Sequence, residues 1–320
     1  MKGKQTSVSI ILNTALIIAA FTFIIYQLFF AIESLPENTT LIPLGSWLHP
    51  VLSKILSIVV VALCYLIWFQ FIRKYKFIEE MKPGLLPFSL LLLALNPVFL
   101  VELENAAALF CLTLAISYIL TISNQANVLL PIFSASLALG LSSLFFTPTI
   151  LMLLFLWISI GILRAFEWRN YVITFVGFGM PFLYLYGIAY LLAIPLPPFQ
   201  INIDTTVLKD VQMLSSILLY ILIVLISLFS ISRLFSHQTK MVVHQRKQMQ
   251  IMAAFILFSL LLFFFSSSVK QTIVFAAFPL MIFYGFMLQQ TSRRWIVQFI
   301  LLLFFAAYLW EAVFDDFPFL

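Results

Sequence analysis

A series of long apolar runs constrains this chain more than any other feature. A hydrocarbon core about 30 Å thick needs roughly 20 apolar residues per helix. Eleven runs approach or reach that length, and each predicts one membrane-spanning helix. The runs cover residues 8–31, 51–72, 84–101, 106–122, 128–146, 148–163, 170–194, 212–235, 251–268, 272–289 and 295–312. The sequence therefore predicts an all-α, polytopic transmembrane helix bundle that forms one integral membrane domain over residues 1–320.

The composition excludes a water-soluble protein. The chain is 63% hydrophobic and 9% charged, whereas soluble domains average about 25% charged residues. The two cysteines, Cys64 and Cys111, lie inside apolar runs and are interpreted as small buried hydrophobic residues. No Gly-rich phosphate loop, CxxC or HExxH spacing occurs, which argues against ATP hydrolysis and against a metal site. The basic residues lie beside apolar runs, which argues against nucleic acid as a partner.

The charges are sorted by sign once the apolar runs are treated as spans. Fourteen of the 17 Lys and Arg residues then lie on one side, and nine of the 12 Asp and Glu residues lie on the other. Segments rich in Lys and Arg remain cytoplasmic. We therefore expect the N-terminus inside, the C-terminus outside, and a multi-pass location in a bacterial-type cytoplasmic (inner) membrane. The basic side holds the N-terminal Lys2 and Lys4, followed by Arg73, Lys74, Lys76, Lys82, Arg164, Arg169, Arg233, Lys240, Arg246, Lys247, Arg293 and Arg294.

Two features of the spans bear on function and on topology. Charged residues lie near the ends of the spans, whereas transporters usually keep an ionisable group near the midplane. This favours other functions over transport. The spans between 84 and 163 are short, and Pro131, Gly140 and Pro148 make a re-entrant pair at 128–146 the alternative to a full crossing.

The first candidate site is the outer loop after the first span, which contains Glu33 and Glu37. A carboxylate at the exit of a span lies in a region of reduced dielectric constant, where its pKa rises towards the working range of a general base. Both are therefore candidate catalytic residues. The alternative is that they are solvated loop residues.

The second candidate site is an acidic pair, Glu102 and Glu104, followed by the amide Asn105. Like charges two residues apart are costly near an apolar boundary unless a cation pairs with them. Lys54 and Lys270 lie at the outer ends of other spans and could supply that cation. The alternative is that the two carboxylates simply cap and anchor a helical hairpin.

Lys270 follows three serines at the outer end of a hairpin, and Lys54 lies on the same side. An ammonium group beside hydroxyls can hold a phosphate, so both lysines are candidate residues for binding a lipid phosphate. The alternative for Lys270 is that its side chain extends to the membrane interface as an isolated cation.

On the inner side, Arg164, Trp168 and Arg169 are predicted to form an inner-leaflet anchor. Trp with flanking Arg is typical of the aromatic belt at a membrane interface, and each basic residue there attracts anionic headgroups by about 1 kcal/mol. Glu167 should form a local ion pair that partly offsets this attraction. Small residues at Ser136 and Gly140, and at Gly177 and Gly179, are interpreted as close helix contacts.

Two resemblances add to these interpretations. The segments Arg164–Asn170, Gly177–Tyr184 and Gly140–Pro148 resemble an uncharacterised bacterial inner-membrane family of unknown function. More distantly, Asn96-Pro97 and the following spans to Pro148 resemble the polyprenyl-phosphate-dependent membrane glycosyltransferases of the type-C fold.

The second resemblance implies an acidic base in the first outer loop and an outer cation that binds a lipid phosphate. Glu33 or Glu37 and Lys270 occupy comparable positions here, although the loop at 32–50 is short and the usual base is Asp. We therefore expect a type-C-like membrane protein that handles a lipid or polyprenyl-phosphate-linked substrate on its outer face. The alternatives are a non-catalytic membrane subunit of a cell-envelope complex with other envelope proteins as partners, and, third, a transporter.

Overall fold

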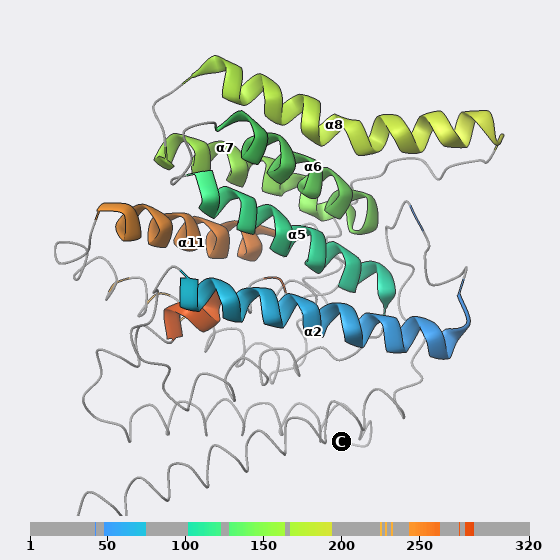
Figure 1. Cartoon of the computed structure of the whole chain (residues 1–320), viewed down its shortest axis with the longest axis horizontal. Coiled ribbons are helices and arrows are strands. Elements are labelled where there is room, and N and C mark those ends of the chain that lie inside the picture. Colours follow the sequence, from blue (N-terminus) through green and yellow to red (C-terminus); the bar gives the residue numbers. More distant parts are fainter. Residues whose placement is uncertain are drawn as a thin grey trace, which may run out of the picture.

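The described part of this protein is built of helices. In the computed structural model it comprises residues 42, 48–74, 102–122, 128–163, 167–193, 225, 228, 232, 243–262, 275 and 279–284, and none of these lies in a strand. The elements are α2 (Pro50–Lys74), α5 (Leu103–Thr121), α6 (Leu129–Phe145), the 3-10 helix η3 (Thr147–Leu151), α7 (Met152–Leu163), α8 (Trp168–Leu191) and α11 (Val243–Leu261) (Figure 1). The prediction of an all-α protein is confirmed for these residues.

Helix lengths and composition support a membrane protein. Three described helices, α2, α5 and α8, are long and apolar enough to cross a bilayer. The apolar segments Leu129–Phe145 and Thr147–Leu163 are shorter. The predicted spans at 8–31, 84–101 and 295–312 lie outside the described residues, as do most of 212–235 and 272–289. Eleven spans therefore remain a prediction.

Four helices form a row in the order α8, α6, α5, α2, and α7 packs against this row and against α11 (Figure 1). The chain runs in one direction in α2, α5 and α7 and in the opposite direction in α6, α8 and α11 (Figure 1). This alternation brings the last residues of α2, α5 and α7 to the same end as the first residues of α6, α8 and α11.

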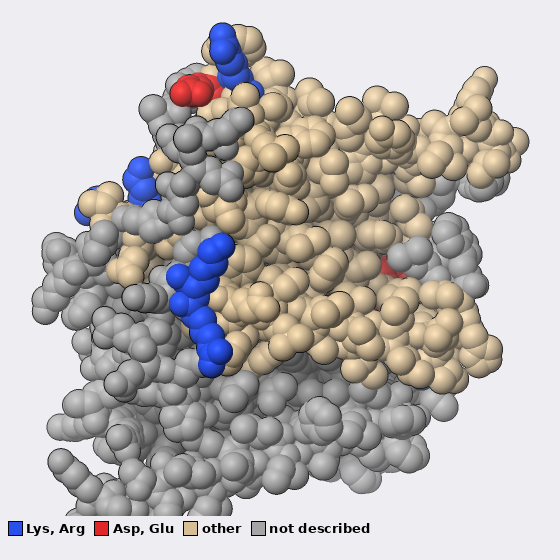
Figure 2. All heavy atoms as spheres, viewed as in Figure 1, with Lys and Arg blue, Asp and Glu red and all other residues tan. Residues whose placement is uncertain are grey.

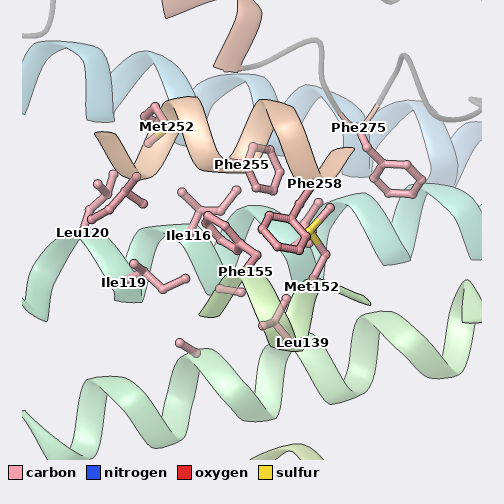
Figure 3. Packing of buried hydrophobic residues seen from close by; sticks show 14 of the residues in the cluster. Ile116, Ile119, Leu120, Leu139, Met152, Phe155, Met252, Phe255, Phe258 and Phe275 are labelled. Atoms are coloured by element: carbon pink, nitrogen blue, oxygen red, sulfur yellow. The ribbon is translucent and has the colours of Figure 1, made fainter. Parts of the chain in front are cut away.

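The core joins these helices through aromatic and aliphatic side chains. Phe155 of α7 packs against Phe255 and Phe258 of α11, with ring centroids 5.2 and 6.2 Å apart (Figure 3). Ile116, Ile119 and other residues of α5 border this cluster. Lipid tails are as apolar as these side chains, so helix association in a bilayer depends on close packing and interhelical hydrogen bonds.

Hydrogen bonds within the bundle link neighbouring helices of the described part. The indole nitrogen of Trp68 on α2 donates to the Thr113 hydroxyl on α5 at 3.4 Å. Ser142 on α6 donates to the backbone oxygen of Ala108 on α5 at 3.0 Å. The third bond runs from the indole of Trp157 on α7 to the hydroxyl of Thr174 on α8, at 2.8 Å.

Helices α6 and α8 approach each other most tightly at two glycines, where a side chain would clash with the facing helix. A Cβ at Gly140 would lie 2.5 Å from the backbone oxygen of Phe178, and a Cβ at Gly177 would lie 2.0 Å from the Ser136 hydroxyl. The predicted close contacts at Ser136, Gly140 and Gly177 are therefore confirmed. The prediction for Gly179 is wrong, because no atom would lie within 4 Å of its Cβ. Gly179 is two residues from Gly177, and a helix turns about 200° over that distance, to its other side.

Helix α8 carries exposed aromatic residues at both ends. Trp168 begins the helix and Tyr190 nearly ends it, and the two are 65% and 87% exposed. At 1.5 Å per residue they are about 33 Å apart along the axis, close to the thickness of a bilayer core. Trp and Tyr are enriched at the two membrane interfaces. The helix bends partway along (Figure 1), and it contains the helix-bending residue Pro181.

Two details differ from the sequence-based expectations. Residues 243–250, which lie between the predicted spans at 212–235 and 251–268, form the first turns of α11. Pro131 and Gly140, expected to mark hinges, both lie inside the continuous helix α6. The choice between a full crossing and a re-entrant segment at 128–146 stays a prediction. Only Pro148 lies at a break, in the 3-10 turn after the extended residue Phe146. Pro131 is tolerated because it lies in the first helical turn, where few amides have intrahelical partners.

Candidate functional site: the two ends of the helix row

One end of the bundle, here called the basic end, collects most of the described cations. Figure 2 shows the Lys and Arg side chains gathered along this end of the visible face. They belong to helix termini, since Arg73 and Lys74 lie in the last turn of α2, and Arg169 lies in the first turn of α8. Arg246 and Lys247 lie in the first two turns of α11. The charge sorting expected from the sequence is thus reproduced in space for these residues.

Lys247 connects two helices at the basic end. Its ammonium group donates to the backbone oxygen of Leu163, the last residue of α7, at 3.0 Å. The final carbonyls of a helix lack intrahelical partners and carry partial negative charge, so a cation at this position stabilises α7. Cations in the first turns of α11 face the positive end of its own dipole. The bond to α7 offsets part of that cost.

The predicted inner-leaflet anchor is partly described. Trp168 and Arg169 are both exposed at the start of α8, and the guanidinium of Arg169 lies 6.0 Å from the centroid of the Trp168 ring. Arg164 lies outside the described residues. Glu167 accepts a hydrogen bond from the amide nitrogen of Asn170 at 3.5 Å. The ion pair expected for Glu167 remains a prediction.

The opposite end, here called the acidic end, holds Glu102 and Glu104 at the start of α5. Glu102 occupies the N-cap position with an extended backbone, and Glu104 lies in the first turn. Carboxylates at these positions are favoured by the partial positive charge of a helix N-terminus. The alternative that the two residues cap a helix is therefore consistent with the backbone. Neither is deeply buried, and both are half-exposed.

The acidic end also contains a buried amide side chain, that of Asn105. Its amide nitrogen donates to a carboxylate oxygen of Glu102. The residue is fully buried, and its side-chain oxygen Oδ1 has no hydrogen-bond partner. An acceptor buried without a partner costs roughly 1–3 kcal/mol. The same Glu-x-x-Asn arrangement recurs at the start of α8, where the amide nitrogen of Asn170 donates to Glu167.

The register between α2 and α5 shows that Asn105 lies below the surface of the acidic end. Trp68 and Thr113 are hydrogen-bonded partners 45 positions apart on parallel helices. The same offset of 45 positions puts Asn105 at the level of Val60. Val60 is ten residues after Pro50, the first residue of α2, which is about 15 Å along the helix axis at 1.5 Å per residue. Figure 1 shows α5 beginning, and α6 ending, short of the ends of α2 and α8.

The C-terminus of α6 lies at the level of Asn105. Ser142 contacts Ala108 across the two antiparallel helices. Asn105 lies one turn beyond Ala108, and Phe145 lies one turn beyond Ser142 in the same direction. The chain then leaves the helix, since Phe146 is extended with φ of −140°. The last carbonyls of α6 thus lie at about the same level along the bundle as Asn105, and they carry a partial negative charge.

Of the other residues predicted on the outer face, the structure describes Lys54. Glu33, Glu37 and Lys270 lie outside the described residues. Lys54 is half-buried on α2, and the register above puts it about 4.5 Å beyond the level of Glu102.

The sequence analysis identified Glu102 and Glu104 as candidate site residues, but it did not predict the unpartnered side-chain oxygen of Asn105. Pro148 is the feature of the sequence that could have predicted where α6 ends, because proline commonly follows the end of a helix.

Comparison of the chain with protein-family models, with curated proteins and with solved structures finds no match. The resemblances to an uncharacterised inner-membrane family and to type-C glycosyltransferases remain predictions.

Proposed function

We propose that this chain is an eleven-span protein of a bacterial-type cytoplasmic membrane, with its basic end in the cytoplasm and a type-C-like architecture. It binds a lipid or lipid-linked substrate at the acidic end, on the outer face. The observation that carries the proposal is the separation of the two ends. Cations gather at the basic end, and at the other end the buried amide of Asn105 donates to the half-exposed carboxylate of Glu102.

A fully buried amide such as that of Asn105 is expensive unless it serves a substrate or a partner. Lys54, one turn beyond Glu102, would neutralise the phosphate of a polyprenyl-linked substrate. Lys270, which the sequence predicts on the same side of the membrane, would assist. In a catalytic cycle Glu33 or Glu37 would remove the proton of an acceptor hydroxyl while the cations stabilise the leaving phosphate.

Binding of a polyprenyl phosphate tests this proposal. The purified full chain is placed in lipid nanodiscs, and the affinity for the polyprenyl phosphate is measured for the unchanged chain, for Lys54→Gln and for Lys74→Gln. Lys74 is the matched control, since it lies on the same helix at the basic end. We expect Lys54→Gln to weaken binding about tenfold, which corresponds to about 1.4 kcal/mol. Absence of binding to the unchanged chain would contradict the proposal and favour a non-catalytic envelope subunit.

A further inference from the structure

Helix α7 exposes an apolar stripe along one face, here called the α7 stripe. It consists of Leu154, Ile158 and Gly161, which are all exposed and follow one another at intervals of four and three positions. Residues at this spacing lie on one face of a helix. Leu154 and Ile158 are 46% and 47% exposed, whereas half of the residues of α7 are buried. The stripe is therefore the part of α7 that is open to lipid or to a ligand.

Two neighbouring helices flank the α7 stripe. Trp157 points towards α8, because its indole nitrogen donates to Thr174 there. Phe155 points towards α11, where its ring packs against that of Phe255 (Figure 3). With about 100° of rotation per residue, the stripe lies between the directions of Trp157 and Phe155. An acyl chain along the stripe would therefore have α8 on one side and α11 on the other.

The length of the α7 stripe matches the depth of one membrane leaflet. Leu163 ends α7 at the basic end, and Leu154 lies nine residues before it. At 1.5 Å per residue, the stripe reaches about 13.5 Å along the bundle from the level of Leu163. Half of a hydrocarbon core about 30 Å thick is about 15 Å. One acyl chain of a lipid in the leaflet at the basic end fits this length.

On the side of α11, two cations lie where the α7 stripe ends. The ammonium group of Lys247 donates to the backbone oxygen of Leu163 at 3.0 Å. Arg246, the residue before it, is exposed. The final carbonyls of a helix carry partial negative charge and would repel a phosphate. Lys247 binds one of these carbonyls, which lowers the repulsion next to Arg246.

On the side of α8, Trp168 and Arg169 lie at the same level. Helices α7 and α8 run in opposite directions, and the hydrogen bond between Trp157 and Thr174 sets their register (Figure 1). Six residues from this bond towards the basic end are Leu163 on α7 and Trp168 on α8. Arg169 follows Trp168, and both are exposed. The end of the stripe therefore lies between a cation on α8 and cations on α11.

The described residues of the basic end have a net positive charge. Glu167 is acidic, and the basic residues are Arg73, Lys74, Arg169, Arg246 and Lys247 (Figure 2). The first amides of α8 and α11 add the partial positive charge of two helix N-termini. Helix N-termini and arginine side chains are both suited to a phosphate. An apolar stripe that ends among these groups matches a molecule with an acyl chain and an anionic headgroup.

We infer that an anionic phospholipid binds at the α7 stripe. One acyl chain lies along the stripe, the phosphate is held at Arg246, and the headgroup extends towards Arg169 across the end of α7. Basic residues between membrane helices on the cytoplasmic side are typical of such headgroup sites. This inference goes beyond the proposed function, which concerns the acidic end. It also goes beyond the predicted anchor, because it assigns one lipid to a defined place on three helices.

Binding of phosphatidylglycerol to the purified full chain in phosphatidylcholine nanodiscs tests the inference. Phosphatidylglycerol is added in increasing amounts, and the lipid that remains on the protein is counted by native mass spectrometry. The unchanged chain should retain one phosphatidylglycerol at saturation. Its melting temperature should rise over the same range of lipid, since a ligand that binds the folded state stabilises it.

Gly161→Phe and Gly187→Phe form the matched pair for the stripe. A Cβ at Gly161 would lie 3.8 Å from the Tyr171 hydroxyl, and a Cβ at Gly187 would have no atom within 4 Å, so both positions accept a side chain. Phe at position 161 would occupy the place of the acyl chain and should weaken phosphatidylglycerol binding at least tenfold. Phe at position 187, in the last turns of α8 at the opposite end, should leave binding unchanged.

Arg246→Gln and Arg73→Gln form the matched pair for the headgroup. Loss of Arg246 should weaken phosphatidylglycerol binding about fivefold, which corresponds to about 1 kcal/mol. Arg73 is also exposed at the basic end, but it lies on α2, which packs mainly against α5. Its replacement should leave the retained lipid in place. This pair serves even if Gly161→Phe does not fold.

Three results would overturn the inference. These are an unchanged chain that retains no phosphatidylglycerol, a folded Gly161→Phe protein that still retains one, and equal losses of binding for Arg246→Gln and Arg73→Gln. Each would leave the basic end with a general attraction for anionic lipid. Polyprenyl phosphate affinity is measured on the same variants and should not change. Its absence from the unchanged chain would contradict the proposed function and leave this inference standing.

Discussion

Gly177 of α8 lies against Ser136 of α6 so closely that a Cβ at position 177 would fall 2.0 Å from the serine hydroxyl and 2.9 Å from the backbone oxygen of Phe133. The hydroxyl is itself bound to the Phe133 carbonyl at 2.9 Å. Any side chain at 177 would therefore push two helix backbones apart. Since packing replaces hydrophobic burial as the force between membrane helices, the stability of this helix pair depends on the glycine.

Gly177→Ala should lower the stability of the purified protein by about 1–3 kcal/mol, the usual cost of overpacking a core. Gly179→Ala is the matched control, because it lies in the same helix and nothing lies within 4 Å of its Cβ. The control should be neutral or slightly stabilising, since Ala is favoured over Gly inside a helix by about 1 kcal/mol. Thermal unfolding in detergent measures both. Equal effects would show that α6 and α8 do not pack as described.

Lys247 provides a second test, at the basic end. Lys247→Met removes the hydrogen bond to the carbonyl of Leu163 and should destabilise the protein by about 1 kcal/mol. Arg246→Met is the control. Arg246 is exposed, and its replacement removes the same positive charge from the same end of the bundle. Unfolding curves that coincide for the two variants would mean that charge alone, and not the link between α7 and α11, determines the effect.

The sequence predicted the positions of several helices, but it did not predict which polar side chains are buried between them. The apolar run at 51–72 became α2 (Pro50–Lys74), and the run at 128–146 became α6 (Leu129–Phe145). Hydropathy failed at the start of α11, since the polar residues from Gln245 to Gln248 are good helix formers although they are not apolar.

The candidate site could be predicted only in part. Glu102 and Glu104 stand out because carboxylates are rare in this chain. The buried state of Asn105 depends on which side of α5 faces α6, and the sequence does not state that. That burial arises from contacts between helices more than 30 positions apart, such as Ser142 with Ala108.

Cysteine labelling tests the orientation of the two ends. Cys64 and Cys111 are both buried, so they can be replaced by Ala and single cysteines introduced at Leu192 and Arg246, which are exposed. In intact cells a membrane-impermeant maleimide should label Leu192→Cys, because the acidic end is proposed to face outward. Arg246→Cys should react only after permeabilisation. Reporter fusions within 195–211 should likewise read external, and fusions within 73–82 cytoplasmic. The reversed pattern would contradict the assigned orientation.

The inner-leaflet anchor can be separated from the outer site by replacing Arg164 and Arg169 together with Gln. Each basic residue near an anionic surface contributes about 1 kcal/mol, and Trp168 remains to hold the helix at the interface. The unchanged protein should therefore unfold at a higher temperature in phosphatidylglycerol nanodiscs than in phosphatidylcholine nanodiscs, and the double variant should lose part of that difference. Its affinity for a polyprenyl phosphate should not change, since Arg169 lies at the basic end, about 32 Å along α8 from Tyr190. A double variant that kept its lipid preference and topology but lost polyprenyl binding would place the substrate site at the basic end instead.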